Sequence, residues 1–138
     1  MTAPSASAAT RRRILVADDE PHIGRIIKMK LENGPFEVQL AFDGREALDA
    51  LRAEPTSFDL VLLDLMMPEL SGIDVLSAMR SELHSETPAI ILTAAGQDEQ
   101  ERDALAHGAN AFVTKPFSPK KLYALVARLT GVQEGDEA

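Results

Sequence analysis

Short apolar runs alternate with helix-like patterns along this chain, and this alternation is the feature that most restricts its possible folds. The runs at 13–17, 58–63 and 89–92 are almost wholly apolar, which is typical of parallel strands that are buried on both faces. The run at 36–41 alternates apolar and polar residues, as an edge strand does, and a shorter run follows at 111–114. Five strand–helix units with short connections predict an α/β fold, in which helices cover both faces of a five-stranded parallel sheet.

Apolar residues at helical spacing predict a helix after each of these strands. Four of the stripes are well populated: Ile23, Ile26, Ile27 and Leu31; Ala47, Leu48 and Leu51; Val75, Leu76, Met79 and Leu83; and Leu122, Leu125, Val126 and Leu129. The helix predicted over 98–107 is different, because its stripe is limited to Ala104 and Leu105. We therefore expect this helix to be the least firmly held.

Acidic and polar residues stand at the points where the predicted strands end. They are Asp18 and Asp19 after the first strand, Asp64 after the third, Thr93 after the fourth and Lys115 after the fifth. The carboxyl ends of parallel strands meet at one edge of the sheet, so we expect these side chains to converge. Three carboxylates facing a hydroxyl group and a lysine indicate a site for a divalent cation and a phosphoryl group.

Taken one at a time, these residues also have structural interpretations. Asp18 and Asp19 could form an N-cap before Pro21, and Thr93 could cap the turn that follows its strand. Asp64 could simply end a strand before a turn. Their joint occurrence favours the phosphoryl site. A carboxylate that attacks phosphorus needs a cation to neutralise the developing charge, and one of two adjacent acids can act on that cation through water.

The composition of the chain argues against several classes of function. With 138 residues, the chain is long enough for one domain with a single core. It contains no cysteine, so it has neither disulfides nor thiolate metal ligands, which fits a cytoplasmic location. No apolar run approaches the roughly 20 residues that span a membrane. The formal net charge of −8 argues against direct binding of nucleic acid.

Composition also predicts the domain boundaries. Residues 1–10 are mostly Ala, Ser, Thr and Pro, and we expect them to form a disordered tail that is not a secretory signal. Residues 11–130 are expected to fold, and 131–138 to be a flexible acidic tail or the start of a linker. No helix-turn-helix segment or enzymatic domain is seen after residue 130. The chain is therefore expected either to act alone or to come from a longer regulator.

The motifs at the strand ends resemble those of the receiver domain of bacterial two-component response regulators. They are Ala17-Asp18-Asp19-Glu20, Leu62-Leu63-Asp64-Leu65-Met66-Met67-Pro68-Glu69-Leu70-Ser71-Gly72, Leu92-Thr93-Ala94 and Thr114-Lys115-Pro116-Phe117. The resemblance spans roughly residues 12–130. It implies a flavodoxin-like, doubly wound sheet with the strand order 2-1-3-4-5.

The resemblance also implies a metal site and a phosphorylation site. Asp64 matches the phosphoacceptor, and Asp18 and Asp19 match the acidic pair that helps to hold Mg²⁺. Asp64 itself and the backbone carbonyl of Met66 are the further metal ligands that the family pattern implies.

Three other positions match residues that bind the phosphoryl group or change conformation in response to it. Thr93 matches the switch hydroxyl, and Lys115 matches the lysine that binds a phosphoryl oxygen. Phe112 occupies the aromatic switch position, where Tyr is frequent in relatives. Lys115-Pro116 matches a peptide bond that is usually cis in the family.

The partners implied by the resemblance are a histidine kinase or a histidine phosphotransfer protein as the phosphoryl donor. The output is expected through a downstream effector, or a homodimer, at the surface formed by the helix 98–107, the strand 111–114 and the last helix. On this interpretation the chain is not an enzyme, and it catalyses only its own phosphorylation and dephosphorylation.

Two alternatives compete with a signalling receiver. One is a Mg²⁺-dependent phosphohydrolase with an Asp nucleophile, and the other is a degenerate receiver that serves only as a scaffold. The phosphohydrolase class usually places an acid two residues after the nucleophile, where this chain has Met66. The scaffold interpretation is disfavoured because all the motif positions carry competent groups.

Overall fold

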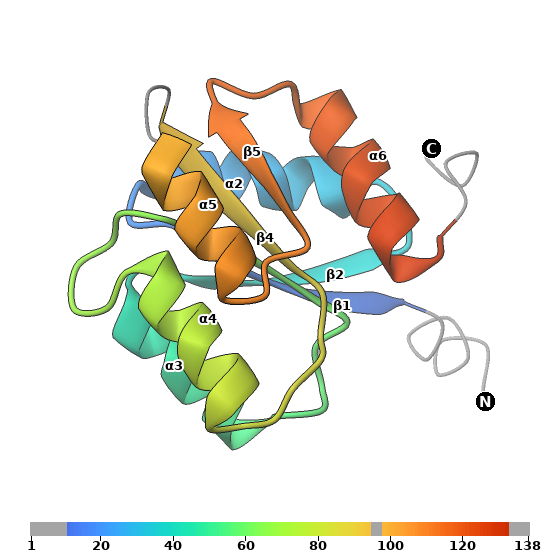
Figure 1. The fold of residues 1–138 in the computed structure, drawn as a ribbon. Coiled ribbons are helices and arrows are strands. Elements are labelled where there is room, and N and C mark those ends of the chain that lie inside the picture. The colour runs from blue at the N-terminus through green and yellow to red at the C-terminus, as the bar shows by residue number, and fades with distance from the viewer. Residues whose placement is uncertain (1–10, 95–97, 133–138) are drawn as a thin grey trace.

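Five parallel strands form a single sheet in a computed structural model that describes residues 11–94 and 98–132 (Figure 1). The strands are β1 (Arg12–Ala17), β2 (Phe36–Ala41), β3 (Leu60–Asp64), β4 (Ala89–Ala94) and β5 (Ala111–Lys115). Their order across the sheet is β2-β1-β3-β4-β5. This arrangement confirms the predicted flavodoxin-like α/β fold and its strand order.

Helices cover both faces of the sheet, as Figure 1 shows. They are α2 (Pro21–Leu31), α3 (Gly44–Ala53), α4 (Gly72–Ser81), α5 (Asp98–Ala106) and α6 (Pro119–Thr130). Helices α2 and α6 share one core with Ile14 and Val16 of β1, whereas α3, α4 and α5 share the other with Leu15 and Ala17. Because successive residues of β1 serve opposite cores, this strand must be apolar throughout.

The edge strand β2 differs from the centre of the sheet as the sequence predicts. In β2 the side chains of Glu37 and Gln39 are exposed, while Phe36 and Val38 are buried. In β3 every residue from Leu60 to Asp64 is buried. A fully buried Leu or Ile contributes about 2 kcal/mol, so the central strands supply much of the hydrophobic stabilisation.

The third strand begins later than its apolar pattern predicts, at Leu60 instead of residue 58. The Asp59 carboxylate accepts a hydrogen bond of 2.8 Å from the backbone N–H of Arg13, and the Arg13 guanidinium lies 4.6 Å from the centre of the Phe58 ring. The Asp59 N–H also donates to the Arg13 carbonyl at 2.7 Å, so Asp59 contacts β1 through both its backbone and its side chain, although the regular strand begins at Leu60. At their other ends, β3 and β5 each extend one residue further than predicted, to include Asp64 and Lys115.

Helix α4 begins immediately after the loop that follows β3, and a glycine permits this close approach. A Cβ atom at Gly72 would lie 2.5 Å from the Asp64 carbonyl oxygen, so no larger residue fits there without movement. Ser71 and Asp74 then form a capping box, in which each side chain accepts a hydrogen bond of 3.1 Å from the other's backbone N–H. This start of α4 fixes the chain directly behind Asp64. The helix ends at Ser81, two residues before Leu83, the last residue of its predicted stripe.

Helix α5 buries little apolar surface, as its thin stripe predicts. Among its described side chains Ala104 is the one that is buried, and Leu105 is 49% exposed. The far end of α5 is held instead by Arg80 of α4, which donates a hydrogen bond of 2.8 Å to the carbonyl of Gly108.

The predicted tail 1–10 lies outside the described residues, as do residues 133–138 of the predicted acidic tail. Gly131 and Val132 are described, and they complete the C-cap of α6. Gly131 adopts a left-handed conformation with φ of 80°, and the Val132 N–H donates to the Ala127 carbonyl at 2.8 Å. No helix within the described ranges has the length and apolar character needed to cross a membrane.

Candidate functional site

The carboxyl ends of β1, β3 and β5 bring three of the predicted site residues together. Lys115 Nζ lies 3.0 Å from Asp18 Oδ2 and 3.2 Å from Asp64 Oδ2. Both aspartates are buried, with 1% of Asp18 and 6% of Asp64 exposed. Two buried carboxylates beside one ammonium group form a compact acidic site with a net negative charge.

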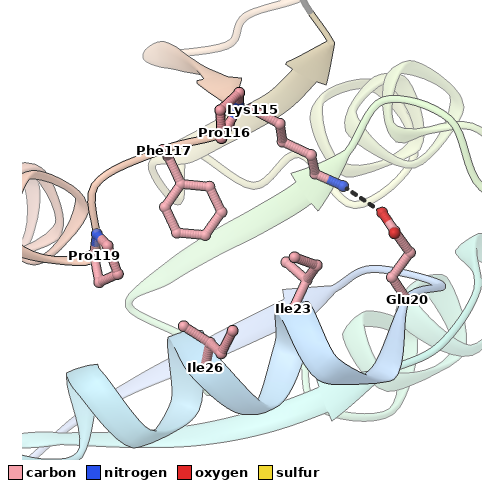
Figure 2. Close-up of a pocket in the computed structure, with 7 residues that line it drawn as sticks. All are labelled: Glu20, Ile23, Ile26, Lys115, Pro116, Phe117 and Pro119. Atoms are coloured by element: carbon pink, nitrogen blue, oxygen red, sulfur yellow. Dashed lines mark hydrogen bonds and ion pairs between the residues drawn. The ribbon is translucent and has the colours of Figure 1, made fainter.

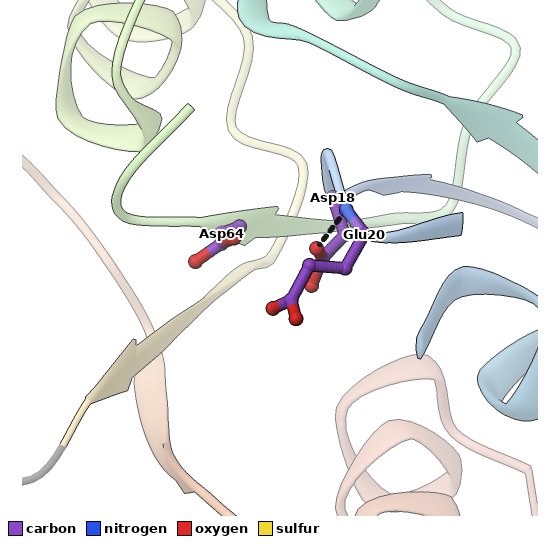
Figure 3. A group of neighbouring side chains, drawn as sticks. All are labelled: Asp18, Glu20 and Asp64. Carbon is purple, nitrogen blue, oxygen red and sulfur yellow. Dashed lines mark hydrogen bonds between the residues drawn. The ribbon is translucent and has the colours of Figure 1, made fainter. Parts of the chain in front are cut away.

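A further carboxylate, Glu20, joins this site although the sequence analysis assigns it no role. Carboxylate oxygens of Asp18, Glu20 and Asp64 all lie within 4.8 Å of one another (Figure 3). Glu20 Oε1 is 3.2 Å from Lys115 Nζ, and the Glu20 backbone N–H donates to Asp18 Oδ1 at 2.9 Å. Its position two residues after Asp18 could have indicated this, because side chains two residues apart in an extended chain point to the same side.

Asp19 lies differently from its two acidic neighbours. Its side chain is exposed, and its oxygens are not part of the carboxylate group formed by Asp18, Glu20 and Asp64. The alternation of side chains past the end of β1 explains this, because it places Asp18 and Glu20 on one side and Asp19 on the other. A role of Asp19 in metal binding stays a prediction.

The remaining predicted residues lie on β4, on β5 and directly after β3. Thr93 is buried in β4, where its hydroxyl donates to the Ala94 carbonyl at 3.2 Å. Phe112 in β5 is half-buried and packs against the core on the α4 and α5 side. Met66 follows β3 and is 64% exposed.

The electrostatic environment of Asp64 is set by burial and by its neighbours. Burial and, after it, the charge of Asp18 raise the pKa of Asp64 to about 6, against the opposing effect of Lys115 and the Met66 backbone. Burial also disfavours the charge on Lys115, but contact with Asp18 and the charges of both aspartates outweigh it and raise the pKa of Lys115. At neutral pH Lys115 is therefore a permanent cation and Asp64 is mostly an anion.

The donor atoms of the site fit a small divalent cation. Asp18 Oδ2 is buried and accepts no aligned hydrogen bond within the described residues, although Lys115 Nζ lies 3.0 Å away as an ion contact. Mg²⁺ favours hard oxygen ligands and is usually held by one or two carboxylates. A cation between Asp18 and Asp64 would also neutralise the repulsion between them.

A mainly apolar pocket of about 390 Å³ opens beside Lys115 (Figure 2). Its lining comes from α2 and from the loop between β5 and α6, and consists of Glu20, Ile23, Ile26, Lys115, Pro116, Phe117 and Pro119. The Lys115–Pro116 peptide bond is cis, as the resemblance implies. The dashed contact in Figure 2 shows that Glu20 belongs both to this pocket and to the acidic site.

The sheet order and the acids at its carboxyl edge place the chain in the flavodoxin-like class of α/β domains. A family model described as the response regulator receiver domain matches residues 14–127. The chain therefore belongs to the response regulator receiver family, whose members are signalling domains of two-component systems.

Relatives of known sequence or structure agree with this assignment. The transcriptional regulatory protein SrrA of Staphylococcus aureus is 40% identical over 116 residues, which are 84% of this chain and 46% of SrrA. The receiver domain of the Francisella response regulator 1452 is similar in structure, with a TM-score of 0.79 and 37% identity over 88% of this chain and 98% of that one. The chemotaxis protein CheY4 of Vibrio cholerae has a TM-score of 0.78 and 30% identity over 86% of this chain and 98% of its own. The chain thus spans less than half the length of SrrA.

Proposed function

We propose that this chain is a phosphorylation-activated receiver whose phosphoacceptor is Asp64. The phosphoryl group comes from the phosphohistidine of a histidine kinase or a histidine phosphotransfer protein, and its arrival changes binding to a downstream partner. The observation that carries this proposal is the contact of 3.2 Å between buried Asp64 and Lys115 at the edge of the sheet. We place this function in the cytoplasm, where such a kinase presents its phosphohistidine.

The phosphoryl transfer follows from the charges at the site. An oxygen of ionised Asp64 attacks phosphorus, the phosphorus–nitrogen bond of phosphohistidine breaks, and its electron pair stays on the imidazole nitrogen. With the pKa of Asp64 at about 6, most of the nucleophile is ionised at pH 7. Lys115 keeps its charge and offers a compact cation to the phosphoryl oxygens. Hydrolysis reverses the state, because water attacks phosphorus and Asp64 leaves as a carboxylate.

Asp18 and Asp64 are the residues that would hold Mg²⁺, joined by the predicted ligands Asp19 and the Met66 carbonyl. When bound, the metal supplies the positive charge that lets an anionic carboxylate approach an anionic phosphoryl group. The burial of Asp18 keeps its carboxylate oriented toward Asp64. Its Oδ1 is already fixed by the Glu20 N–H, which leaves Oδ2 directed at the site.

The pocket beside Lys115 is where we place the phosphoryl donor. Ile23 and Ile26 of α2 face Phe117 across it, and Ile26 is 43% exposed (Figure 2). An apolar surface of this kind suits the apolar side of a partner helix. A histidine on such a helix would stand next to Lys115 and Asp64.

The output surface is the one formed by α5, β5 and α6. Thr93 is the penultimate residue of the neighbouring strand β4, and a hydrogen bond from its hydroxyl to a phosphoryl group on Asp64 would draw the end of β4 inward. Phe112 stands half-buried on the α5 side of β5, where it can follow that movement. The small buried surface of α5 makes this helix the element that shifts most easily.

Intact-mass measurement with acetyl phosphate tests the proposed function. We expect one phosphoryl group to appear on the unmodified protein with Mg²⁺, and none on the Asp64→Asn variant or in excess chelator. Asp49→Asn is the matched control, because Asp49 is exposed on α3. Labelling that persists in Asp64→Asn would disprove the assignment, and rapid turnover of a small phosphomonoester would favour the phosphohydrolase instead.

A further inference from the structure

The ammonium group of Lys115 is shared among three carboxylates. Its Nζ lies 3.0 Å from Asp18 Oδ2 and 3.2 Å from oxygens of both Asp64 and Glu20. The contacts of Lys115 with Asp64 and Glu20 are hydrogen bonds, whereas its contact with Asp18 is an ion pair. A phosphoryl oxygen that binds Lys115 therefore competes with these carboxylates for the ammonium group.

Glu20 is the partner that can be displaced most easily. Its side chain is 51% exposed, whereas the side chains of Asp18 and Asp64 are 0% and 9% exposed. Water can solvate a released Glu20 carboxylate, but it has little access to the other two. Glu20 is also the N-cap residue of α2, yet its side chain makes no capping hydrogen bond. Its carboxylate is thus committed to Lys115 and not to the helix.

We propose that Glu20 is a positioning residue that holds Lys115 in the unphosphorylated state and competes with the phosphoryl group for it. This inference rests on the proposed function of Asp64. When Asp64 carries a phosphoryl group, Lys115 exchanges Glu20 for a phosphoryl oxygen, and the Glu20 side chain moves toward solvent. Glu20 opposes the phosphorylated state in two ways, by occupying a donor of Lys115 and by repelling the added negative charge.

The location of Glu20 also couples this exchange to the pocket. Glu20 lines the pocket at the start of α2, beside Ile23 (Figure 2). Its release on phosphorylation therefore changes the charge and shape of the wall that the phosphoryl donor contacts. A donor that binds the unphosphorylated wall is expected to bind the phosphorylated one differently.

Binding of beryllofluoride, a mimic of the phosphoryl group, tests this role without any turnover. Titration calorimetry at saturating Mg²⁺ would compare the unmodified protein with Glu20→Gln, which keeps the size of the side chain and removes its charge. We expect Glu20→Gln to bind beryllofluoride about two- to fivefold more tightly, the range that a partly exposed ion pair supports. Glu37→Gln is the matched control, because Glu37 is exposed on β2 beside Arg13, near the opposite edge of the sheet, and its affinity should not change.

A second variant separates contact from charge. Glu20→Asp keeps the charge but shortens the side chain by one methylene group, so it should lose the contact with Lys115 and also bind beryllofluoride more tightly. Mg²⁺ affinity, measured separately, should change less than twofold in Glu20→Gln.

Three results would overturn the inference. Equal beryllofluoride affinities in Glu20→Gln and the unmodified protein would exclude competition for Lys115. A tenfold loss of Mg²⁺ affinity in Glu20→Gln would make Glu20 a metal ligand instead. If the unmodified protein failed to bind beryllofluoride at all, the proposed function of Asp64 would fall, and this inference with it.

Discussion

At the scale of single residues, the site concentrates negative charge where water is scarce. Asp18 and Asp64 are both buried, and Lys115 is the cation that lies between them. An arrangement of this kind is unfavourable for folding, since each buried carboxylate loses solvation that one lysine only partly replaces. In the proposed function, this cost in stability accompanies a site that can bind a cation and a phosphoryl group.

Asp64 should make the metal-free protein less stable as the pH rises. Its pKa of about 6 in the folded state lies above the usual value near 4, so the folded state binds the proton more tightly than the unfolded state. The stability contributed by the protonated form is fully present below about pH 4 and is lost as the pH rises through about 6. Allowing for solvent screening, we expect a loss of about 1 to 2 kcal/mol from this group.

Urea denaturation between pH 4.5 and 7.5 with a chelator present would measure this effect. The Asp64→Asn variant should be more stable than the unmodified protein at pH 7, by about the same 1 to 2 kcal/mol, and should lose that advantage toward pH 4.5. Asp49→Asn serves as the control for an exposed acid. A pH profile of Asp64→Asn that runs parallel to that of the unmodified protein would contradict the assigned pKa shift.

At the scale of elements, α5 is the helix whose placement depends least on apolar burial. Polar contacts from Arg80 hold the C-terminal end of α5. In the connection after α4, Arg80 donates to the backbone carbonyls of Ser85 and Thr87. After α5, it donates to the backbone carbonyl of Gly108 and to the side-chain oxygen of Asn110. One side chain thus joins the ends of two helices. This leaves the end of α5 that faces the site more able to move than the end held by Arg80.

Replacing Arg80 with Met should destabilise the protein and loosen the connection after α5. Methionine is similar in length to the aliphatic part of arginine but has no hydrogen-bond donor. We therefore expect the free energy of unfolding to fall by about 2 to 3 kcal/mol. Hydrogen exchange at residues 107–110 should accelerate. Arg52→Met is the matched control. Arg52 donates two hydrogen bonds to the Glu82 carboxylate, but this pair lies on the exposed surface, where it contributes less than about 1 kcal/mol. Equal losses in the two variants would refute the special role of Arg80.

Beryllofluoride should change hydrogen exchange in α5, β5 and the start of α6. The reason is that Thr93 is drawn toward the mimic, and Phe112 can respond on the side that packs against α5. A bias of a few kcal/mol is enough to shift a two-state element almost completely. Exchange mass spectrometry with and without the mimic would measure it, with Asp64→Asn as the control. Changes confined to α2 and α3 would place the output surface elsewhere.

At the scale of the whole molecule, metal binding should be visible as stability. A ligand that binds only the folded state stabilises it by about 2.7 kcal/mol when its concentration is 100 times its dissociation constant. We expect thermal unfolding to shift upward with Mg²⁺, and the double variant Asp18→Asn with Asp19→Asn to lose that shift. Without metal the double variant should be as stable as the unmodified protein, or more stable by up to about 1 kcal/mol. A full Mg²⁺ shift in the double variant would exclude both acids as ligands.

Much of this architecture could be predicted from the sequence because it depends on local patterns. The apolar runs of β1 and β3 and the alternation in β2 follow directly from which faces of the sheet are covered. The start of β3 at Leu60 could not be predicted from the apolar run, because it depends on pairing with β1, which is distant in sequence. Family resemblance, and not any pattern of spacing, supplied the strand order.

The site was predictable in its strand-end residues but not in its finer arrangement. Which of the acids after β1 point inward depends on the backbone direction beyond the strand, and the structure directs Asp18 and Glu20, not Asp19, toward Asp64. The contact between Glu20 and Lys115 joins residues far apart in the chain, so no local sequence pattern predicts it. The pocket likewise requires α2 and the loop after β5 to meet.

The ends of the described chain meet at the sheet edge that lies opposite the site. Arg12, at the start of β1, donates a hydrogen bond of 3.3 Å through its Nε to the carbonyl of Thr130, the last residue of α6. A short linker could therefore join residue 132 to residue 11, and new ends could be opened at another loop of the same edge. Such a circular permutant would leave Asp64 and the pocket beside Lys115 in place, and either rearranged end could carry a reporter that does not obstruct them.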